Sequence, residues 1–285
     1  MPNTRERDGA SIYYEQHGEA GDPVLLVMGL GGDMQFWEYQ VPAFAARHRA
    51  FILDNRGAGR SGKPPGPYST VQMADDAVAV LDDAKIERAH VVGLSMGGMI
   101  AQQIAIRHPA RVGALVLAAT YARADAGVRQ VSEAGAAEAR LPSPLALLSG
   151  GALDLRSADM SALFRFMMGL VLSPEFIQKE KEWLRSLQER LLASGAGPEQ
   201  LLAQVAAVLS HDAVAGLSQV SAPTLVMTGT ADRLVPPHHA EVLAELIPGA
   251  KLVRIEGGTH GFNIEMRDRF NKAVLDFLAE HPLAS

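Results

Sequence analysis

The chain has 285 residues, 48% of them hydrophobic and 20% charged, which is an ordinary composition for a globular protein with a sizeable core. A formal net charge of −6 does not favour nucleic-acid binding, and the lack of cysteine excludes disulfides, thiolate metal sites and cysteine nucleophiles. The polar start MPNTRERDGA has no apolar segment of a signal peptide, and no apolar run approaches the roughly 20 residues of a membrane span, so we expect a soluble, cytoplasmic protein.

Short apolar runs recur along the chain and predict the strands of a β-sheet. Continuous runs rich in valine and leucine are typical of strands that are buried on both faces, as in parallel sheets. These runs occupy residues 23–29, 50–54, 89–93, 114–119, 223–229 and 251–257. Residues 11–18, SIYYEQHG, alternate between apolar and polar side chains, which favours an antiparallel edge strand.

Helical patterns lie between these runs. The pattern over residues 69–84 begins with Ser69 or Thr70 as its N-cap, and its apolar face consists of Val71, Ala74, Val78 and Leu81. The helix that follows residue 95 should end just before Pro109, because the residue before a proline disfavours helix. A repeating order of strand, helix and strand predicts βαβ units and a parallel sheet.

Residues 121–215 interrupt this order, since they contain helical patterns and no convincing strand. We expect a helical insertion between two strands of the sheet. Its most apolar helix has a face made of Leu163, Phe166, Met167, Leu170 and Val171. Such a face usually belongs to a core, but it can also line a pocket for an apolar group. We name Phe166, Met167 and Leu170 as candidate substrate-binding residues.

The stretch GLSMGG, residues 93–98, places Ser95 between a predicted strand and a predicted helix. Parallel α/β sheets bind ligands at the carboxyl ends of their strands. A residue in a sharp strand-to-helix turn crowds its neighbours, and glycines two positions before and after it have no Cβ to clash. The pattern favours Ser95 as a nucleophile, with the Met96 N–H directed at a developing oxyanion. The alternative is a serine N-cap of an ordinary helix.

A serine nucleophile needs a base, and in this architecture the chain order is serine, acid, histidine. His260 lies in the glycine-rich stretch EGGTHGFN directly after the last predicted strand, and it is the candidate base. Asp232 follows the strand at residues 223–229 and is the candidate acid, although an Asx turn would also account for an aspartate there. Asp125, in the loop after an earlier strand, is the alternative acid.

Two patterns that could indicate a cofactor or a metal lack the context that such a site requires. GAGRSG, residues 57–62, matches G-x-G-x-x-G, but the KPPGP that follows cannot begin the helix of a dinucleotide site. His238 and His239 are adjacent, but no third metal ligand is evident. We therefore expect no cofactor and no metal.

Five stretches together resemble the α/β-hydrolases, in the branch of esterases, enol-lactonases and cofactor-free haloperoxidases. They keep the order expected of that family and span nearly the whole chain outside the insertion. They are MGLGGDMQFW at 28–37, DNRGAGRSGKP at 54–64, VVGLSMGGMIAQ at 91–102, GTADRLVPP at 229–237 and GGTHGF at 257–262.

This resemblance implies an α/β-hydrolase fold, a mostly parallel sheet flanked by helices. It implies a catalytic triad of Ser95, Asp232 and His260, and it adds the Leu30 N–H as the second oxyanion donor. Residues 121–215 correspond to the family's helical cap, and residues 1–120 with 216–285 correspond to its core domain. Many members have His-Gly where this chain has Met28-Gly29, and that difference concerns the shape of the loop more than the chemistry.

The predicted function is hydrolysis of carboxylic esters of short to medium acyl chain through an acyl-enzyme intermediate, with a small-molecule ester or lactone as substrate and no nucleic-acid or membrane partner. The alternatives are hydrolysis of enol-lactones, other lactones or C–C bonds by the same triad, and non-catalytic ligand binding. A charged lactone needs a cation in the pocket, for which Arg123, Arg129 and Arg165 are candidates. The apolar helix around Arg165 favours neutral esters instead. The sequence does not specify an oligomeric state.

Overall fold

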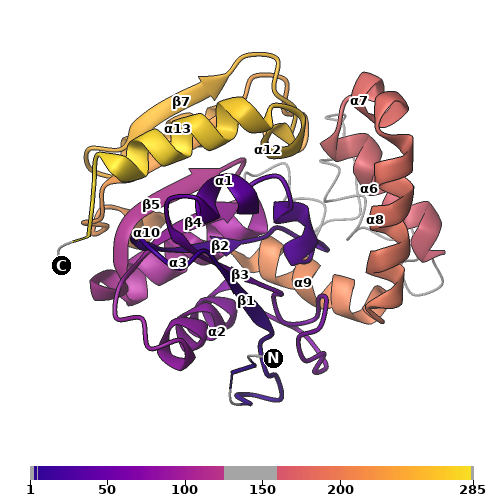
Figure 1. Ribbon diagram of the computed structural model, residues 1–285, viewed down its shortest axis with the longest axis horizontal. Helices are drawn as coiled ribbons and strands as arrows, with labels where there is room; N and C mark the ends of the chain where they lie inside the picture. The colour runs from indigo at the N-terminus through magenta and orange to yellow at the C-terminus, as the bar shows by residue number, and fades with distance from the viewer. Residues whose placement is uncertain (1–2, 5, 125–158, 284–285) are drawn as a thin grey trace, which may run out of the picture.

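The computed structural model describes residues 3–4, 6–124 and 159–283. Its centre is one seven-stranded sheet with the strand order β1-β3-β2-β4-β5-β6-β7 (Figure 1). The strands are β1 Tyr14–His17, β2 Pro23–Val27, β3 Arg49–Leu53, β4 Ala89–Leu94, β5 Val112–Ala118, β6 Thr224–Gly229 and β7 Lys251–Ile255. β1 pairs with β3 in antiparallel register at one edge, and every other pairing in the sheet is parallel.

The strand order creates a crevice between the carboxyl ends of β2 and β4. From β2 the chain crosses to β3 on one side, whereas from β4 it crosses to β5 on the other side. The loops that follow β2 and β4 therefore diverge at this point, and such a switch point is where open α/β sheets bind ligands. Val27 pairs with Gly93 next to it, so the loop after β2 begins beside the start of the loop that contains Ser95.

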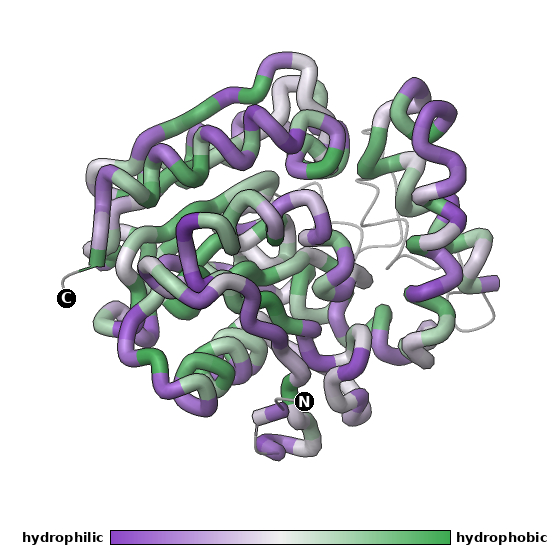
Figure 2. The backbone as a smooth tube through the Cα atoms, in the orientation of Figure 1, coloured by the Kyte–Doolittle hydropathy of each residue, from purple (hydrophilic) through white to green (hydrophobic). Residues whose placement is uncertain are grey.

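Alternate side chains of the strands enter two separate hydrophobic cores, one on each face of the sheet. Leu25 and Val27 pack on one face, and Val24 and Leu26 pack on the other. The first core is closed by α2 Thr70–Asp83, α3 Met96–Arg107, α10 Val214–Leu217 and α11 His238–Leu246, and the second by η1 Met34–Trp37, α1 Val41–Ala45, α12 Phe262–Glu265 and α13 Arg267–Ala279. Burial of both faces explains the continuous apolar runs of β2, β4, β5 and β6, and the central strands are mostly green in Figure 2. The edge strand β7 is mostly exposed or half-buried, so the burial expected for the run at residues 251–257 is wrong for most of that strand.

The predicted fold class is confirmed, and the predicted elements are found within a few residues of their expected ends. α2 begins after Ser69, whose hydroxyl accepts a hydrogen bond from the Gln72 N–H. α3 ends at Arg107, and a short 3-10 helix η2 Pro109–Arg111 follows it. The antiparallel edge strand predicted within residues 11–18 is β1.

Between β5 and β6 the described chain is helical, with α6 Met160–Val171, α7 Pro174–Lys179, α8 Lys181–Ala193 and α9 Pro198–Ser210. Figure 1 shows these helices grouped on one side of the sheet, away from α13 and the C-terminus. An isolated bridge between Arg123 and Asp212 joins the two ends of the segment. None of the helices in the described ranges is long and apolar enough to cross a membrane.

Candidate active site

Ser95 occupies a strained backbone position between β4 and α3. Its φ of 57° and ψ of −121° lie outside the regions that side-chain-bearing residues favour, and such strain costs about 1–3 kcal/mol. The Ser95 N–H donates to the Ala118 carbonyl at 2.8 Å, while the Ser95 carbonyl accepts from the Gly98 N–H at 2.9 Å. The residue is thus fixed at the end of the strand, and it lines the crevice at the carboxyl edge of the sheet.

The glycines around Ser95 are required by close backbone contacts. A Cβ on Gly93 would lie 2.3 Å from the Gly97 carbonyl oxygen, and a Cβ on Gly97 would lie 2.0 Å from the Val27 carbonyl oxygen. No side chain fits at these distances, because the turn after β4 packs directly against the end of β2. The spacing of the two glycines therefore follows from how tightly the turn is seated on the sheet.

His260 and Asp232 meet beside this crevice, although 28 positions separate them in the sequence. His260 Nδ1 lies 2.9 Å from Asp232 Oδ2, and both side chains are buried. Asp232 follows β6 and His260 follows β7, two neighbouring parallel strands whose carboxyl ends lie at the same edge of the sheet. An ionised carboxylate can only accept hydrogen bonds, so this contact places the imidazole proton on Nδ1 and leaves Nε2 free to take a proton.

Asp232 also forms the Asx turn that an aspartate at this place in the sequence allows. Its Oδ1 accepts hydrogen bonds from the Leu234 N–H at 2.9 Å and the Val235 N–H at 2.8 Å. The turn and the contact with His260 are compatible, because each uses a different carboxylate oxygen. The turn fixes the carboxylate so that it can orient the imidazole.

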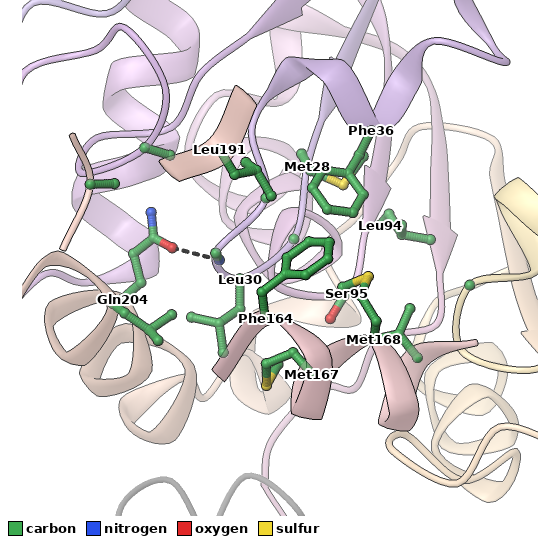
Figure 3. Close-up of a pocket in the computed structure, with 18 of the residues that line it drawn as sticks. Met28, Leu30, Phe36, Leu94, Ser95, Phe164, Met167, Met168, Leu191 and Gln204 are labelled. Atoms are coloured by element: carbon green, nitrogen blue, oxygen red, sulfur yellow. Dashed lines mark hydrogen bonds between the residues drawn. The ribbon is translucent and has the colours of Figure 1, made fainter. Parts of the chain in front are cut away.

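One cavity of about 150 Å³ contains both Ser95 and His260 among its lining residues. The loop after β2, the loop at residues 57–59 and the helices α6, α8 and α9 form most of the remaining wall. Within the described chain, no lysine, arginine, aspartate or glutamate lines the cavity, and most of its lining side chains are apolar. Figure 3 shows Ser95 with Phe164, Met167 and Gln204 around this space.

The face of α6 that reaches the cavity overlaps the face predicted from the sequence, since Leu163, Met167 and Val171 line the cavity. Of the three candidate substrate-binding residues, Met167 is among the residues that line the cavity, whereas Phe166 and Leu170 are not. Phe164 and Met168 line it instead. Phe164 and Met168 lie four positions apart and share one side of the helix, next to the side that carries Leu163, Met167 and Val171. Phe166 packs against the hydrophobic core that includes α2 and α3.

Of the candidate cations for a carboxylate, the two that the structure describes, Arg123 and Arg165, are not among the residues that line the cavity. Arg165 is an exposed residue of α6 and is not part of the lining. Arg123 lies 3.6 Å from Asp212 Oδ2, with both side chains largely exposed. Arg129 and the alternative acid Asp125 lie outside the described residues. The exposed position of Arg165 agrees with the preference for neutral esters that the apolar helix indicated.

Leu30 and Met96, the predicted oxyanion donors, lie in the two segments that meet at Ser95. Leu30 belongs to the loop after β2 and lines the cavity, and a Cβ on the preceding Gly29 would lie 3.0 Å from Ser95 Cβ. Met96 is the first residue of α3, where backbone N–H groups have no partner within the helix and the helix dipole is positive. Both N–H groups therefore belong to segments that adjoin Ser95.

Gln204 is a residue of this region that the sequence patterns did not single out. It lies on α9, is only 1% exposed and lines the cavity. Its Oε1 accepts from the Gly31 N–H at 2.9 Å, and its Nε2 donates to the Arg56 carbonyl at 2.9 Å. The available signal was an amide on the apolar face of an amphipathic helix, next to Ala203, Val205, Ala207 and Val208.

A buried histidine at the end of α9 has a shifted pKa. His211 follows α9, and its Nδ1 lies 3.0 Å from Thr70 Oγ1. Burial lowers the pKa of His211 to about 4, against the smaller opposing effect of Asp212. In the part of the chain that the structure describes, no three His, Cys, Asp or Glu side chains are grouped so that they could hold a metal ion.

Comparisons with known proteins place the chain in a family. The model of the alpha/beta hydrolase fold family matches residues 22–266. A protein of Azorhizobium caulinodans named "Putative carbamate hydrolase RutD" is 34% identical over 280 residues, covering 98% of this chain and 99% of that protein.

Two solved structures are also similar along almost their whole length. A hydrolase from Pseudomonas aeruginosa PA01 has a TM-score of 0.84 at 31% identity, with 97% of each chain covered. The enol-lactonase from Burkholderia xenovorans LB400 has a TM-score of 0.82 at 27% identity, with 98% of this chain and 100% of that chain covered. The chain therefore belongs to the alpha/beta hydrolase fold family, and it is a hydrolase.

Proposed function

We propose that this protein is a serine hydrolase that cleaves neutral carboxylic esters of short to medium acyl chain through an acyl-enzyme intermediate. Ser95 Oγ attacks the ester carbonyl while His260 takes its proton and later transfers it to the leaving alcohol. Asp232 holds the imidazole in the required tautomer. The hydrogen bond between buried His260 and Asp232 at 2.9 Å, in a cavity shared with Ser95, is the observation that carries the proposal.

The proposed oxyanion hole consists of the Leu30 and Met96 backbone N–H groups. The carbonyl oxygen gains a negative charge when Ser95 adds to the carbonyl carbon, and preorganised donors stabilise this charge. Met96 begins α3, so the helix dipole adds to the stabilisation there. Water then attacks the acyl-enzyme with His260 as base, and the carboxylic acid leaves as Ser95 regains its proton.

We also propose that residues 121–215 act as a helical cap on a core domain formed by residues 1–120 and 216–285. The support comes from the cavity wall, to which α6, α8 and α9 contribute together with the loops after β2 and β3. Substrate specificity then resides mainly in these helices. The triad resides in the core domain, so chemistry and selectivity are carried by different parts of the chain.

The uncharged cavity supports a neutral substrate. Burial of a carboxylate without a paired cation is strongly unfavourable, and no cation lines the described part of the wall. An apolar cavity of about 150 Å³ accommodates a group about the size of benzene. These two properties favour a small or medium neutral acyl group over a carboxylated enol-lactone.

Carbamate hydrolysis is the second candidate function. It is favoured by the 34% identity, over nearly the whole chain, with the protein named "Putative carbamate hydrolase RutD". A neutral carbamate carries nitrogen where an ester carries carbon next to the reacting carbonyl. The same serine addition and the same oxyanion would therefore serve both substrates.

The experiment is a panel of substrates at equal concentration. It contains p-nitrophenyl esters with acyl chains of about two to twelve carbons, neutral lactones, a carboxylated enol-lactone and a neutral aryl carbamate. We expect kcat/KM to peak at about two to eight carbons. A carboxylated enol-lactone or a carbamate that exceeded the best ester by more than about a hundredfold would replace the ester proposal. A ligand that binds while no substrate turns over would indicate a non-catalytic binding protein.

A further inference from the structure

The Gln204 side chain connects three segments of the candidate site through a single amide. It projects from α9 between the loop that follows β2 and the loop that follows β3. Its Oε1 accepts from the Gly31 N–H at 2.9 Å, the bond drawn in Figure 3, and its Nε2 donates to the Arg56 carbonyl at 2.9 Å. Both the acceptor and the donor of this buried amide are therefore used on backbone groups of the core domain.

The backbone next to Gly31 carries the proposed oxyanion donor. The peptide bond between Gly29 and Leu30 is trans, so the Leu30 N–H points opposite to the Gly29 carbonyl. The Gly29 carbonyl accepts a hydrogen bond from the Gly32 N–H at 3.3 Å, which is long. The shorter bond from Gly31 to Gln204 fixes the next peptide plane. Together the two bonds set the direction of the Leu30 N–H.

This loop needs an external restraint, because three of its residues are glycines. Gly31 has a φ of +69°, and glycine at Gly29, Gly31 and Gly32 leaves the backbone many alternative conformations. An oxyanion donor is effective only when its direction is fixed before the reaction. Gln204 is 173 positions away from Gly31 in the sequence, so the restraint comes from the proposed cap and not from the loop itself.

We propose that Gln204 is a positioning residue that holds the Leu30 N–H in the orientation that stabilises the oxyanion. The inference rests on the proposed function, since it assigns a part of α9 to the catalytic machinery of that reaction. The helix then has two roles. It lines the cavity, and it completes the oxyanion hole by restraining the glycine-rich loop.

The test uses the variants Gln204→Leu and Gln204→Glu, with Gln200→Leu as the matched control. Gln200 lies one turn earlier on α9, bonds the Gly197 N–H and is not a cavity-lining residue, so its replacement reports the cost of altering the helix. Kinetics are measured with p-nitrophenyl butyrate. The Ki of an alkyl trifluoromethyl ketone is measured too, because addition of the serine to this ketone produces an oxyanion.

For Gln204→Leu we expect kcat to fall about 10- to 100-fold while KM changes less than about threefold. The Ki of the ketone should rise by the same factor by which kcat/KM falls. Gln204→Glu keeps an acceptor for the Gly31 N–H, so its kcat should exceed that of Gln204→Leu. Gln200→Leu should keep the wild-type kcat. If Gln204→Leu does not fold, Gln204→Asn tests the same contact, because its amide is one methylene too short to hold both bonds.

A folded Gln204→Leu or Gln204→Asn with kcat and Ki within about twofold of wild type would overturn the inference. An equal loss in Gln204→Leu and Gln200→Leu would also overturn it, because the effect would then belong to the helix. The Ser95→Ala variant distinguishes failure of the proposed function from failure of the role proposed for Gln204. If Ser95→Ala keeps its activity, the proposed function fails; if it loses activity while Gln204 variants do not, only the role of Gln204 fails.

Discussion

His260 Nδ1 lies 2.9 Å from Asp232 Oδ2, and Asp232 is itself fixed by two backbone N–H groups of the turn that follows it. The acid therefore cannot rotate away from the imidazole without losing both turn contacts. This restraint suits the role of base proposed for His260, because it keeps the ring in one tautomer and one orientation.

Replacement of Asp232 by asparagine should lower kcat by about 10²- to 10⁴-fold, since an amide can present an N–H to Nδ1 and favour the wrong tautomer. The variant keeps the size of the side chain, so circular dichroism should be unchanged. Asp125→Asn is the comparison, because Asp125 is the alternative acid in the sequence. A larger loss in Asp125→Asn than in Asp232→Asn would transfer the role of acid to the earlier loop.

Ser95→Ala should lower kcat by about 10³- to 10⁶-fold with the fold intact, because no other hydroxyl is predicted to attack the carbonyl. Mass spectrometry after treatment with a phosphonate or sulfonyl fluoride should find the label on Ser95 and on no other serine. Retention of more than about a tenth of the wild-type activity would show that the nucleophile is another residue.

Phe164→Ala should shift the preferred acyl chain towards longer esters, because Phe164 lines the cavity and its removal enlarges the space near Ser95. Phe166→Ala is the matched control on the same helix. Its ring packs against the core, so we expect a loss of stability of about 2–4 kcal/mol without a change in chain-length preference. The profile of kcat/KM over the ester series distinguishes the two. Equal shifts in both variants would contradict the observed orientation of α6.

Gly97→Ala should destabilise the protein by at least about 2 kcal/mol, because the added methyl group would lie 2.0 Å from the Val27 carbonyl oxygen. Gly169→Ala makes the same chemical change within α6, where, outside the helix's own backbone, no atom of the described residues lies within 4 Å of the added Cβ. Alanine is the better helix former, so this control should gain up to about 1 kcal/mol. The change in the free energy of unfolding is measured for both variants from urea unfolding curves. A Gly97→Ala variant as stable as wild type would mean that the turn after β4 is not tightly seated.

His211 should make the protein less stable in mild acid. Burial lowers its folded-state pKa to about 4, while an unfolded histidine has a pKa of about 6.5. Between these values the unfolded chain binds more protons, so the free energy of unfolding falls as the pH falls from about 6.5 to 4. Titration of His211 alone lowers the free energy of unfolding by about 2 kcal/mol between about pH 7 and pH 5.

The variant His211→Gln should show a smaller loss of stability over the same pH range, by about 2 kcal/mol. The comparison with wild type is necessary because other buried groups titrate too. Burial raises the pKa of Asp54 to about 6, which acts in the opposite direction, and burial lowers the pKa of His90 to about 4. Both groups remain in the variant and cancel in the difference. Parallel curves for the two proteins would exclude His211 as a source of acid sensitivity.

The sequence alone determined the sheet and the positions of the candidate catalytic residues along it. The central strands were recognisable because both faces of a central parallel strand are buried, which makes their apolar runs continuous. Ser95, Asp232 and His260 were recognisable because each follows one of these runs within a short stretch rich in glycine or proline. Parallel strands bring their carboxyl ends to one edge, so local patterns were sufficient to gather the three residues there.

Only the tertiary structure decided which residues of the helical segment face that edge. Helical periodicity shows which side chains share a face, but the direction of the face depends on how the helix packs against distant parts of the chain. This is why Phe164 lines the cavity in place of Phe166, and why Arg165 is exposed. It is also why Gln204 could not be assigned from the sequence, since its partner Gly31 is 173 residues away and the contact exists only once α9 packs beside the loops that follow β2 and β3.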